Sequence, residues 1–164
     1  MKNILLLGAG KSSHLLIKYL LSNAATNDWE VTVADISLEQ AKTSLGNHSS
    51  GNAIALDVNN AEQREQAISA SHLVISLLPP ALHLLAAKDC LKFKKHLVTA
   101  SYVSPEMKAL NNDAVQSGLI FLNECGLDPG IDHMSAMKII DSVHVAGGKI
   151  TEFRSYTGGL IAPE

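Results

Sequence analysis

The chain has 164 residues, of which 46% are hydrophobic and 18% are charged, and its formal net charge is −3. This length and composition are typical of one globular domain with a buried core. The negative charge provides no basic footprint for nucleic acid, so no nucleic-acid partner is expected. The most apolar window, residues 73–87, is interrupted by prolines and is too short to span a bilayer, so no membrane association is expected.

The two cysteines, Cys90 and Cys125, have neither metal-ligand nor disulfide-framework spacing. Reduced thiols of this kind are typical of a cytosolic protein. Because Met1 leads directly into the first apolar run, there is no room for a signal peptide. We therefore expect a cytoplasmic protein, and we expect no metal site.

The first predicted element is a buried strand over residues 3–7, which ends in Gly8-Ala9-Gly10 and is followed by a helical pattern over residues 14–21. This is the sequence form of a nucleotide-binding strand, turn and helix. Gly8 permits the tight turn, and Gly10 leaves room for a pyrophosphate to approach the backbone. The motif therefore predicts a dinucleotide site at the end of the first strand.

A Walker phosphate loop is the competing interpretation, because Gly10-Lys11-Ser12 copies the last three residues of that motif. That loop needs a glycine five residues before Gly10, where Leu5 stands inside the strand, so we exclude it. Instead, the amide groups of Gly10, Lys11 and Ser12 are predicted to begin a helix that favours an anion. Ser13 occupies the place where a third small residue packs the helix against the strand.

The second predicted strand, over residues 29–35, ends in Asp35, which follows Gly10 by 25 positions. At about this spacing an acidic residue accepts hydrogen bonds from the adenosine ribose hydroxyls. A carboxylate there would repel a 2′-phosphate, and Ile36 supplies no neighbouring cation. The pattern therefore favours NAD over NADP, with a plain turn role for Asp35 as the alternative.

The third predicted strand, over residues 51–57, also ends in an acid, Asp57. In folds of this kind the following loop lies beside the adenine, so Asp57 and Val58 are candidates for that end of the cofactor. A simple turn role for Asp57 is the alternative. Asn59 is predicted to cap a mostly polar helix over residues 61–70.

Three further apolar runs, over residues 72–77, 96–100 and 119–122, are predicted as strands. The helix before the last of them is expected to begin at Ser104 and Pro105. This strict alternation of strands and helices predicts an α/β protein with a doubly wound parallel sheet, the Rossmann type. Right-handed crossovers place the carboxyl ends of all strands at one edge, where ligands bind.

The second informative stretch is residues 123–134, in which Asp128 is predicted to cap a helix and Pro129 to occupy its first turn. Asp128 could instead hold a substrate ammonium or order a proton-carrying water. His133 is predicted to be a packing residue rather than a catalytic acid. The apolar residues of the helix are predicted to contact the core: Met134, Met137, Ile140 and Val143 or His144.

Four stretches resemble the saccharopine dehydrogenase family of the L-glutamate-forming type: residues 76–79 (SLLP), 96–105 (HLVTASYVSP), 123–133 (NECGLDPGIDH) and 155–164 (SYTGGLIAPE). The resemblance implies an oxidoreductase of lysine metabolism. Glutamate and 2-aminoadipate 6-semialdehyde condense to an imine, and NAD(P)H delivers hydride to its carbon to give saccharopine. This chemistry requires no strong nucleophile, which agrees with the absence of one in the sequence.

The resemblance also implies site residues, although no catalytic group is singled out. The positions that match cofactor contacts are Gly8, Ala9, Gly10, Lys11, Ser12, Ala34, Asp35, Asp57, Val58, Leu78, Pro79, Tyr102, Val103, Leu127, Asp128, Pro129, Gly130 and Ile131. The positions that match saccharopine contacts are Ser101, Tyr102 and Asp128. Asp35 and Ile36 replace a Cys-Arg type of pair that suits NADP in fungal members.

The resemblance further implies a division of the chain into an NAD(P)-binding domain over residues 1–147 and the first strand of a truncated substrate domain over residues 148–164. The catalytic second domain is then missing from the chain, so this fragment alone is expected to be inactive. The final strand is expected to be frayed or paired with another copy, which makes a homodimer possible. The expected partner is a small amino-acid substrate. The alternatives are a nucleotide-sensing regulatory module and a relative that forms carboxynorspermidine or homospermidine.

Overall fold

The protein is built around one parallel sheet. The computed structural model describes residues 1–156 and residue 158 of the chain. The strands lie in the order β3-β2-β1-β4-β5-β6. Their bounds are Lys2–Leu7 (β1), Trp29–Asp35 (β2), Gly51–Ala55 (β3), Leu73–Ser76 (β4), His96–Thr99 (β5) and Phe121–Leu122 (β6). Every neighbouring pair is parallel, which confirms the predicted α/β doubly wound sheet.

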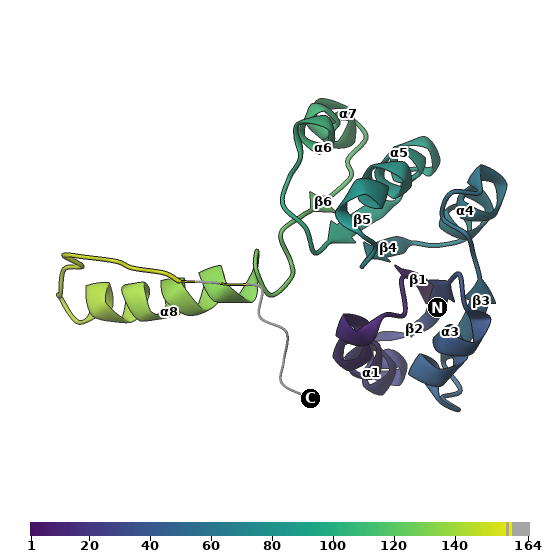
Figure 1. Cartoon of the computed structure of the whole chain (residues 1–164), viewed down its shortest axis with the longest axis horizontal. Helices are drawn as coiled ribbons and strands as arrows, with labels where there is room; N and C mark the ends of the chain where they lie inside the picture. The colour runs from purple at the N-terminus through teal and green to yellow at the C-terminus, as the bar shows by residue number, and fades with distance from the viewer. Residues whose placement is uncertain (157, 159–164) are drawn as a thin grey trace.

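Helices lie on both faces of the sheet (Figure 1). The helices and 3-10 turns before β6 are η1 (Lys11–Ser13), α1 (His14–Ser22), α2 (Ala24–Asn27), α3 (Leu38–Leu45), α4 (Ala61–Ser69), η2 (Pro80–Leu82), α5 (His83–Phe93), α6 (Pro105–Ala109) and α7 (Asn111–Gln116). The α1 and α3 helices cover one face, whereas α4, α5 and α6 cover the other.

The central strand β1 shows how the sequence builds these two layers. Its side chains alternate between the faces, as the pleat of a strand requires. Leu5 and Leu7 pack in the cluster that includes α4 and α5, whereas Ile4 and Leu6 pack in the cluster with α1 and α3. All four side chains are buried. Because both faces of this strand are covered, residues 4–7 form an unbroken apolar run.

The predicted bounds of the strands and helices in residues 1–122 agree with the structure to within a few residues, but one predicted helix cap does not. The α4 helix is capped by Asn60, whose side chain accepts a hydrogen bond from the Gln63 amide, and not by Asn59. Asn59 is instead held by Asp57, which accepts from its amide at 2.9 Å. Ser104 caps α6 as predicted.

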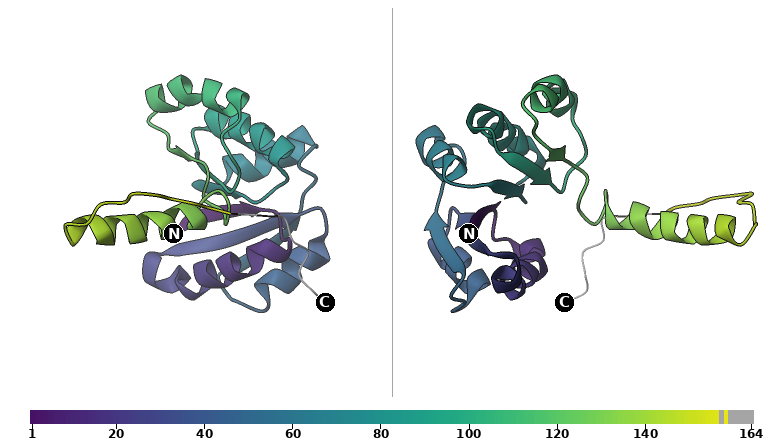
Figure 2. Two further views of the ribbon diagram at one scale, coloured as in Figure 1. Left: turned by 60° about the vertical axis from the view of Figure 1, so that its left-hand side comes forward. Right: turned by 180° about the vertical axis from the view of Figure 1, so that it is seen from behind.

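The last helix, α8 (Ile131–Val145), projects away from the sheet (Figures 1 and 2). None of its residues is buried, and Met134 and Met137 are 63% and 49% exposed. The prediction that its apolar residues contact the core is therefore wrong, and so is the packing role of His133, which is exposed. Apolar spacing along a helix indicates that a face is to be covered, but it does not identify what covers it.

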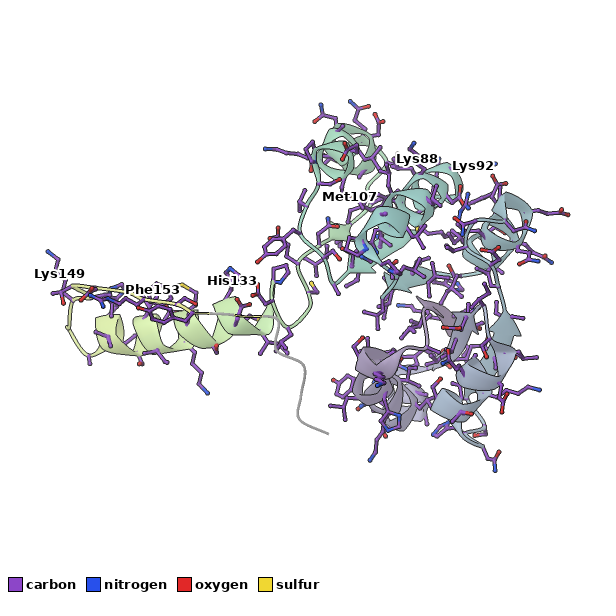
Figure 3. The ribbon with its side chains drawn as sticks, viewed as in Figure 1. Lys88, Lys92, Met107, His133, Lys149 and Phe153 are labelled. Carbon is purple, nitrogen blue, oxygen red and sulfur yellow. The ribbon has the colours of Figure 1, made fainter. Side chains whose placement is uncertain are left out.

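The segment after α8, residues 148–156, runs back alongside the helix and forms no strand (Figure 2). Figure 3 marks it by Lys149 and Phe153. The predicted strand is not formed because a strand needs a hydrogen-bonded neighbour, which the described residues do not offer it. Thr157 and residues 159–164, part of the fourth stretch of resemblance, lie outside the described residues.

Two further observations concern the whole described region. Among its helices, none has the length and apolar character needed to cross a bilayer. Cys90 and Cys125 are both free, the first buried and the second exposed.

Candidate functional site

The carboxyl ends of β1 to β4 border a pocket of about 310 Å³. The parallel topology brings these ends to one edge of the sheet, as expected. Eight residues predicted to contact a cofactor line this pocket: Gly8, Gly10, Ala34, Asp35, Asp57, Val58, Leu78 and Pro79. The fold therefore brings these eight predicted residues together around one pocket.

The turn after β1 leaves room for a ligand at Gly10 but not for a side chain at Gly8. Gly8 has a φ of +103°, and a Cβ there would lie 3.1 Å from the Leu77 carbonyl oxygen. A Cβ on Gly10 would meet nothing within 4 Å. Gly10 precedes the η1 turn, which no side chain caps, so its amide groups suit a pyrophosphate.

Ser13 completes this turn in the way that its place in the motif predicts. It is fully buried, and its hydroxyl donates to the Gly10 carbonyl oxygen at 2.7 Å. Two other predicted residues of the loop, Ala9 and Lys11, line a neighbouring hollow that also includes Ser37. The loop therefore separates two spaces, with the Lys11 side chain on the α3 side.

Asp35 ties the glycine turn to the end of β2. Its Oδ2 accepts a hydrogen bond from the Ala9 amide at 2.8 Å, and its Oδ1 accepts from the Ser37 amide at 2.9 Å. The turn role considered for Asp35 is therefore present in the structure. Each carboxylate oxygen has a second lone pair, so these bonds leave capacity for ribose hydroxyls.

The loop after β3 is held from beneath by a buried ion pair. Arg64 donates from Nη1 to the Val58 carbonyl oxygen and from Nε to Asp89 at 2.6 Å. Both charged side chains are 9% exposed. Sequence reasoning missed this pair, because a charged residue in a polar helix carries no sign that it points inward.

A second cluster lies on the loops after β5 and β6. Tyr102 donates a hydrogen bond to Asp128 Oδ1 at 2.6 Å. This bond is the main reason that the pKa of Tyr102 is raised above its ordinary value, so the phenol keeps its proton at neutral pH. The two residues were predicted to contact substrate, and the fold brings their side chains together.

Asp128 does not cap α8, so that prediction is wrong. The loop folds back on itself, with the Gly126 amide donating to the Pro129 carbonyl at 2.8 Å, and α8 begins only after Gly130. The Gly130 amide donates to Asp132 Oδ1 at 2.9 Å. The Asp128 carboxylate is thereby left available to Tyr102.

The remaining predicted residues lie on the same two loops. Leu127 and Ile131 are 75% and 59% exposed, and Pro129 and Gly130 are buried. The Val103 amide donates to Glu124 Oε1 at 3.2 Å, which joins the two loops.

Ser101, the third predicted substrate residue, is held by a histidine that the sequence did not single out. His83 Nε2 lies 2.9 Å from Ser101 Oγ, and His83 Nδ1 lies 2.8 Å from Ser76 Oγ. His83 as a whole is 3% exposed, and burial lowers the pKa of its side chain. A single histidine after two prolines gives no signal, because its partners are a serine at the end of β4 and another after β5, which only the fold brings to the ring. Among the described residues, no group of three side chains could hold a metal ion.

This topology, with a glycine turn after β1 and an acid after β2, defines a dinucleotide-binding domain of the doubly wound type. Residues 4–122 match the family model described as saccharopine dehydrogenase NADP binding domain. Residues 126–164 match the model described as saccharopine dehydrogenase C-terminal domain. The chain belongs to the saccharopine dehydrogenase family.

Individual relatives agree with this assignment. The chain is 45% identical over its whole length to an NADP(+), L-glutamate-forming saccharopine dehydrogenase of Schizosaccharomyces pombe, and it covers 36% of that protein. It is 40% identical to the mitochondrial alpha-aminoadipic semialdehyde synthase of Bos taurus, with 99% of the chain and 17% of the relative covered. The apo saccharopine dehydrogenase of Saccharomyces cerevisiae has a TM-score of 0.78 at 39% identity, covering 90% of this chain and 32% of that one.

Proposed function

We propose that the protein to which these residues belong interconverts saccharopine with glutamate and 2-aminoadipate 6-semialdehyde, using a nicotinamide cofactor. The family assignment supports this reaction. The observation that carries it is the Tyr102–Asp128 pair, held on loops at the same sheet edge as the Gly8 turn. The chain spans 36% of the S. pombe relative, so further substrate contacts are assigned to residues after Glu164.

The same proposal covers the domain organisation. Residues 1–147 form the cofactor domain, and residues 148–164 lead into the substrate domain. The two family models divide the chain earlier, between residues 122 and 126, and α8, none of whose residues is buried, falls within the second of them. On this proposal the 164-residue chain binds nucleotide but does not turn over saccharopine.

On this proposal a few residues of the chain have defined tasks in the reaction. The bound nicotinamide ring supplies or accepts the hydride. The amide groups from Gly10 onward would hold the pyrophosphate of the cofactor, and Val58 and Leu78, which line the same pocket, would pack against its adenosine. The Asp128 carboxylate stabilises the protonated nitrogen of the substrate, and Tyr102 keeps its own proton and orients that carboxylate.

The cofactor preference follows from Asp35. Its carboxylate is fixed by two backbone amides at the end of β2, so it cannot turn away from a 2′-phosphate without breaking both bonds. The negative charge of the Asp35 carboxylate repels the negative charge of a 2′-phosphate placed beside it. We therefore assign NAD as the preferred cofactor, although the named fungal relatives use NADP.

The reaction is tested by saccharopine-dependent reduction of NAD in the full-length protein. Asp128→Asn removes the charge that stabilises the protonated nitrogen, so we expect kcat/KM to fall by about 100-fold or more. Asp113→Asn, on the distant α7 helix, is the matched control and should leave the rate unchanged. Tight nucleotide binding without saccharopine turnover would instead favour the nucleotide-sensing module, and turnover of a polyamine substrate would favour the carboxynorspermidine type.

The cofactor preference is tested by the ratio of the NADH and NADPH dissociation constants. We expect NADH to bind at least about tenfold more tightly, and Asp35→Asn to reduce that ratio by about tenfold because it removes the repulsive charge. Asp113→Asn again serves as the charge-matched control. Tighter binding of NADPH by the unaltered protein would contradict the assignment.

A further inference from the structure

We propose that His83 is a positioning residue for the substrate. It holds the hydroxyl of Ser101, the residue before Tyr102, at the edge of the crevice, where that hydroxyl can bind the substrate. This inference rests on the proposed function, because it assigns a role within that reaction. It concerns a side chain that neither the motifs nor the pocket at the glycine turn includes.

The three groups come from separate elements that meet at one point. Ser76 is the last residue of β4 and is fully buried, His83 is the first residue of α5, and Ser101 follows β5. The ring spans the two hydroxyls, with 2.8 Å from Nδ1 to Ser76 and 2.9 Å from Nε2 to Ser101. The imidazole therefore connects the sheet interior with the loop that carries Tyr102.

The chemistry of a neutral imidazole makes this connection directional. One ring nitrogen donates and the other accepts, so one serine donates to the ring while the other accepts from it. Since burial lowers the pKa of His83, the ring is neutral at neutral pH. When Nε2 carries the proton, Ser101 accepts from His83, and its own hydroxyl proton is free to bind a substrate carboxylate.

The opposite tautomer reverses the role of Ser101. When Nδ1 carries the proton, His83 donates to Ser76 and accepts from Ser101, which then offers a lone pair to a substrate ammonium. In both states Ser76 keeps its partner, so the exchange leaves no buried polar atom without a hydrogen bond. An amino acid presents both a carboxylate and an ammonium, and this arrangement lets one hydroxyl serve either group.

If His83 had only a structural role, its hydrogen bond to the buried Ser76 would be sufficient. The second ring nitrogen, however, bonds to a residue that is only half-buried and stands next to Tyr102 in the chain. Tyr102 in turn donates to Asp128. The chain of contacts therefore leads from the buried strand β4 toward the residues proposed to bind the substrate.

Two amide variants separate positioning from packing in the full-length protein. The amide nitrogen of glutamine lies near the place of His83 Nε2 and can reach Ser101, whereas that of asparagine lies near Nδ1 and can reach only Ser76. Each variant keeps one of the two bonds, so the pair is matched in lost hydrogen bonding. We expect H83N to raise the KM for saccharopine by about tenfold and H83Q to change it by less than about threefold.

Two further readouts distinguish the outcomes. We expect both variants to bind NADH as the unaltered protein does, and we expect H83N added to S101A to raise the KM no further. Equal KM values for H83N and the unaltered protein, or equal increases in H83N and H83Q, would overturn the positioning role while leaving the proposed function in place. If H83N does not fold, a KM for H83Q/S101A no higher than that of H83Q would overturn it instead. Failure of the unaltered full-length protein to oxidise saccharopine would overturn both.

Discussion

At the scale of single residues, His83 makes the fold sensitive to acid. Burial lowers its pKa from the ordinary value of 6.5, so below that pH the unfolded chain binds a proton that the folded chain does not. The free energy of unfolding should therefore fall as the pH falls from 6.5 to the pKa of the folded state. Urea unfolding at a series of pH values should show this loss in the unaltered protein and a smaller one in H83Q. Identical curves for the two would contradict it.

Gly8 provides a second prediction at this scale. Gly8 has a φ of +103°, and a Cβ added there would lie 3.1 Å from the Leu77 carbonyl oxygen. Gly8→Ala should therefore distort the turn that is proposed to receive the pyrophosphate. We expect NADH affinity to fall by about tenfold or more, because about 1–2 kcal/mol of backbone strain is added at the binding loop.

Gly118→Ala is the matched control for that experiment. Gly118 has a φ of +67°, but a Cβ there meets nothing within 4 Å and it lies outside the pocket. Both variants should lose some stability, and only Gly8→Ala should lose nucleotide binding. Unchanged NADH affinity in Gly8→Ala would show that the nucleotide does not use this turn.

At the scale of elements, the Arg64–Asp89 pair joins α4 to α5 and supports the loop after β3. Arg64→Met leaves the Asp89 carboxylate buried without its cation, so we expect about 3–5 kcal/mol of lost unfolding free energy. The double variant Arg64→Met with Asp89→Leu removes both charges and should recover most of that loss. Chemical denaturation measures both values, and equal stability of the single and double variants would contradict this account.

Figure 3 shows Lys88 and Lys92 on the same helix α5, where Lys92 pairs with Glu65 at 2.7 Å with more than half of its side chain exposed.

The elements also show what a sequence can predict. The apolar run of residues 4–7 predicts β1, because both faces of that strand are buried, and Gly8-Ala9-Gly10 predicts the turn, at which Gly8 has a positive φ. The Arg64 pair and the His83 contacts could not be found, because each depends on which distant residues the fold brings together. Asp128-Pro129 predicts a helix start because Asp-Pro is common at that place, whereas the loop bonds at Gly126 delay the start of α8 to Ile131.

At the scale of the whole molecule, α8 stands apart from the sheet with Met134, Ile139 and Val145 exposed. If the residues beyond Glu164 form the substrate domain, they should cover this helix. Hydrogen exchange should then be slower for α8 amides in the full-length protein than in the 164-residue chain, and unchanged for β1. Equally fast exchange of α8 in both would contradict the proposed domain organisation.

On the proposed function, one crevice at the carboxyl edge of the sheet holds a nicotinamide nucleotide beside the Tyr102–Asp128 pair. A crystal structure of the full-length protein with NADH would reveal where the nucleotide lies. We expect the pyrophosphate at the amides that follow Gly10 and the nicotinamide ring facing Tyr102. A nucleotide bound elsewhere, or one whose nicotinamide end points away from Asp128, would contradict it.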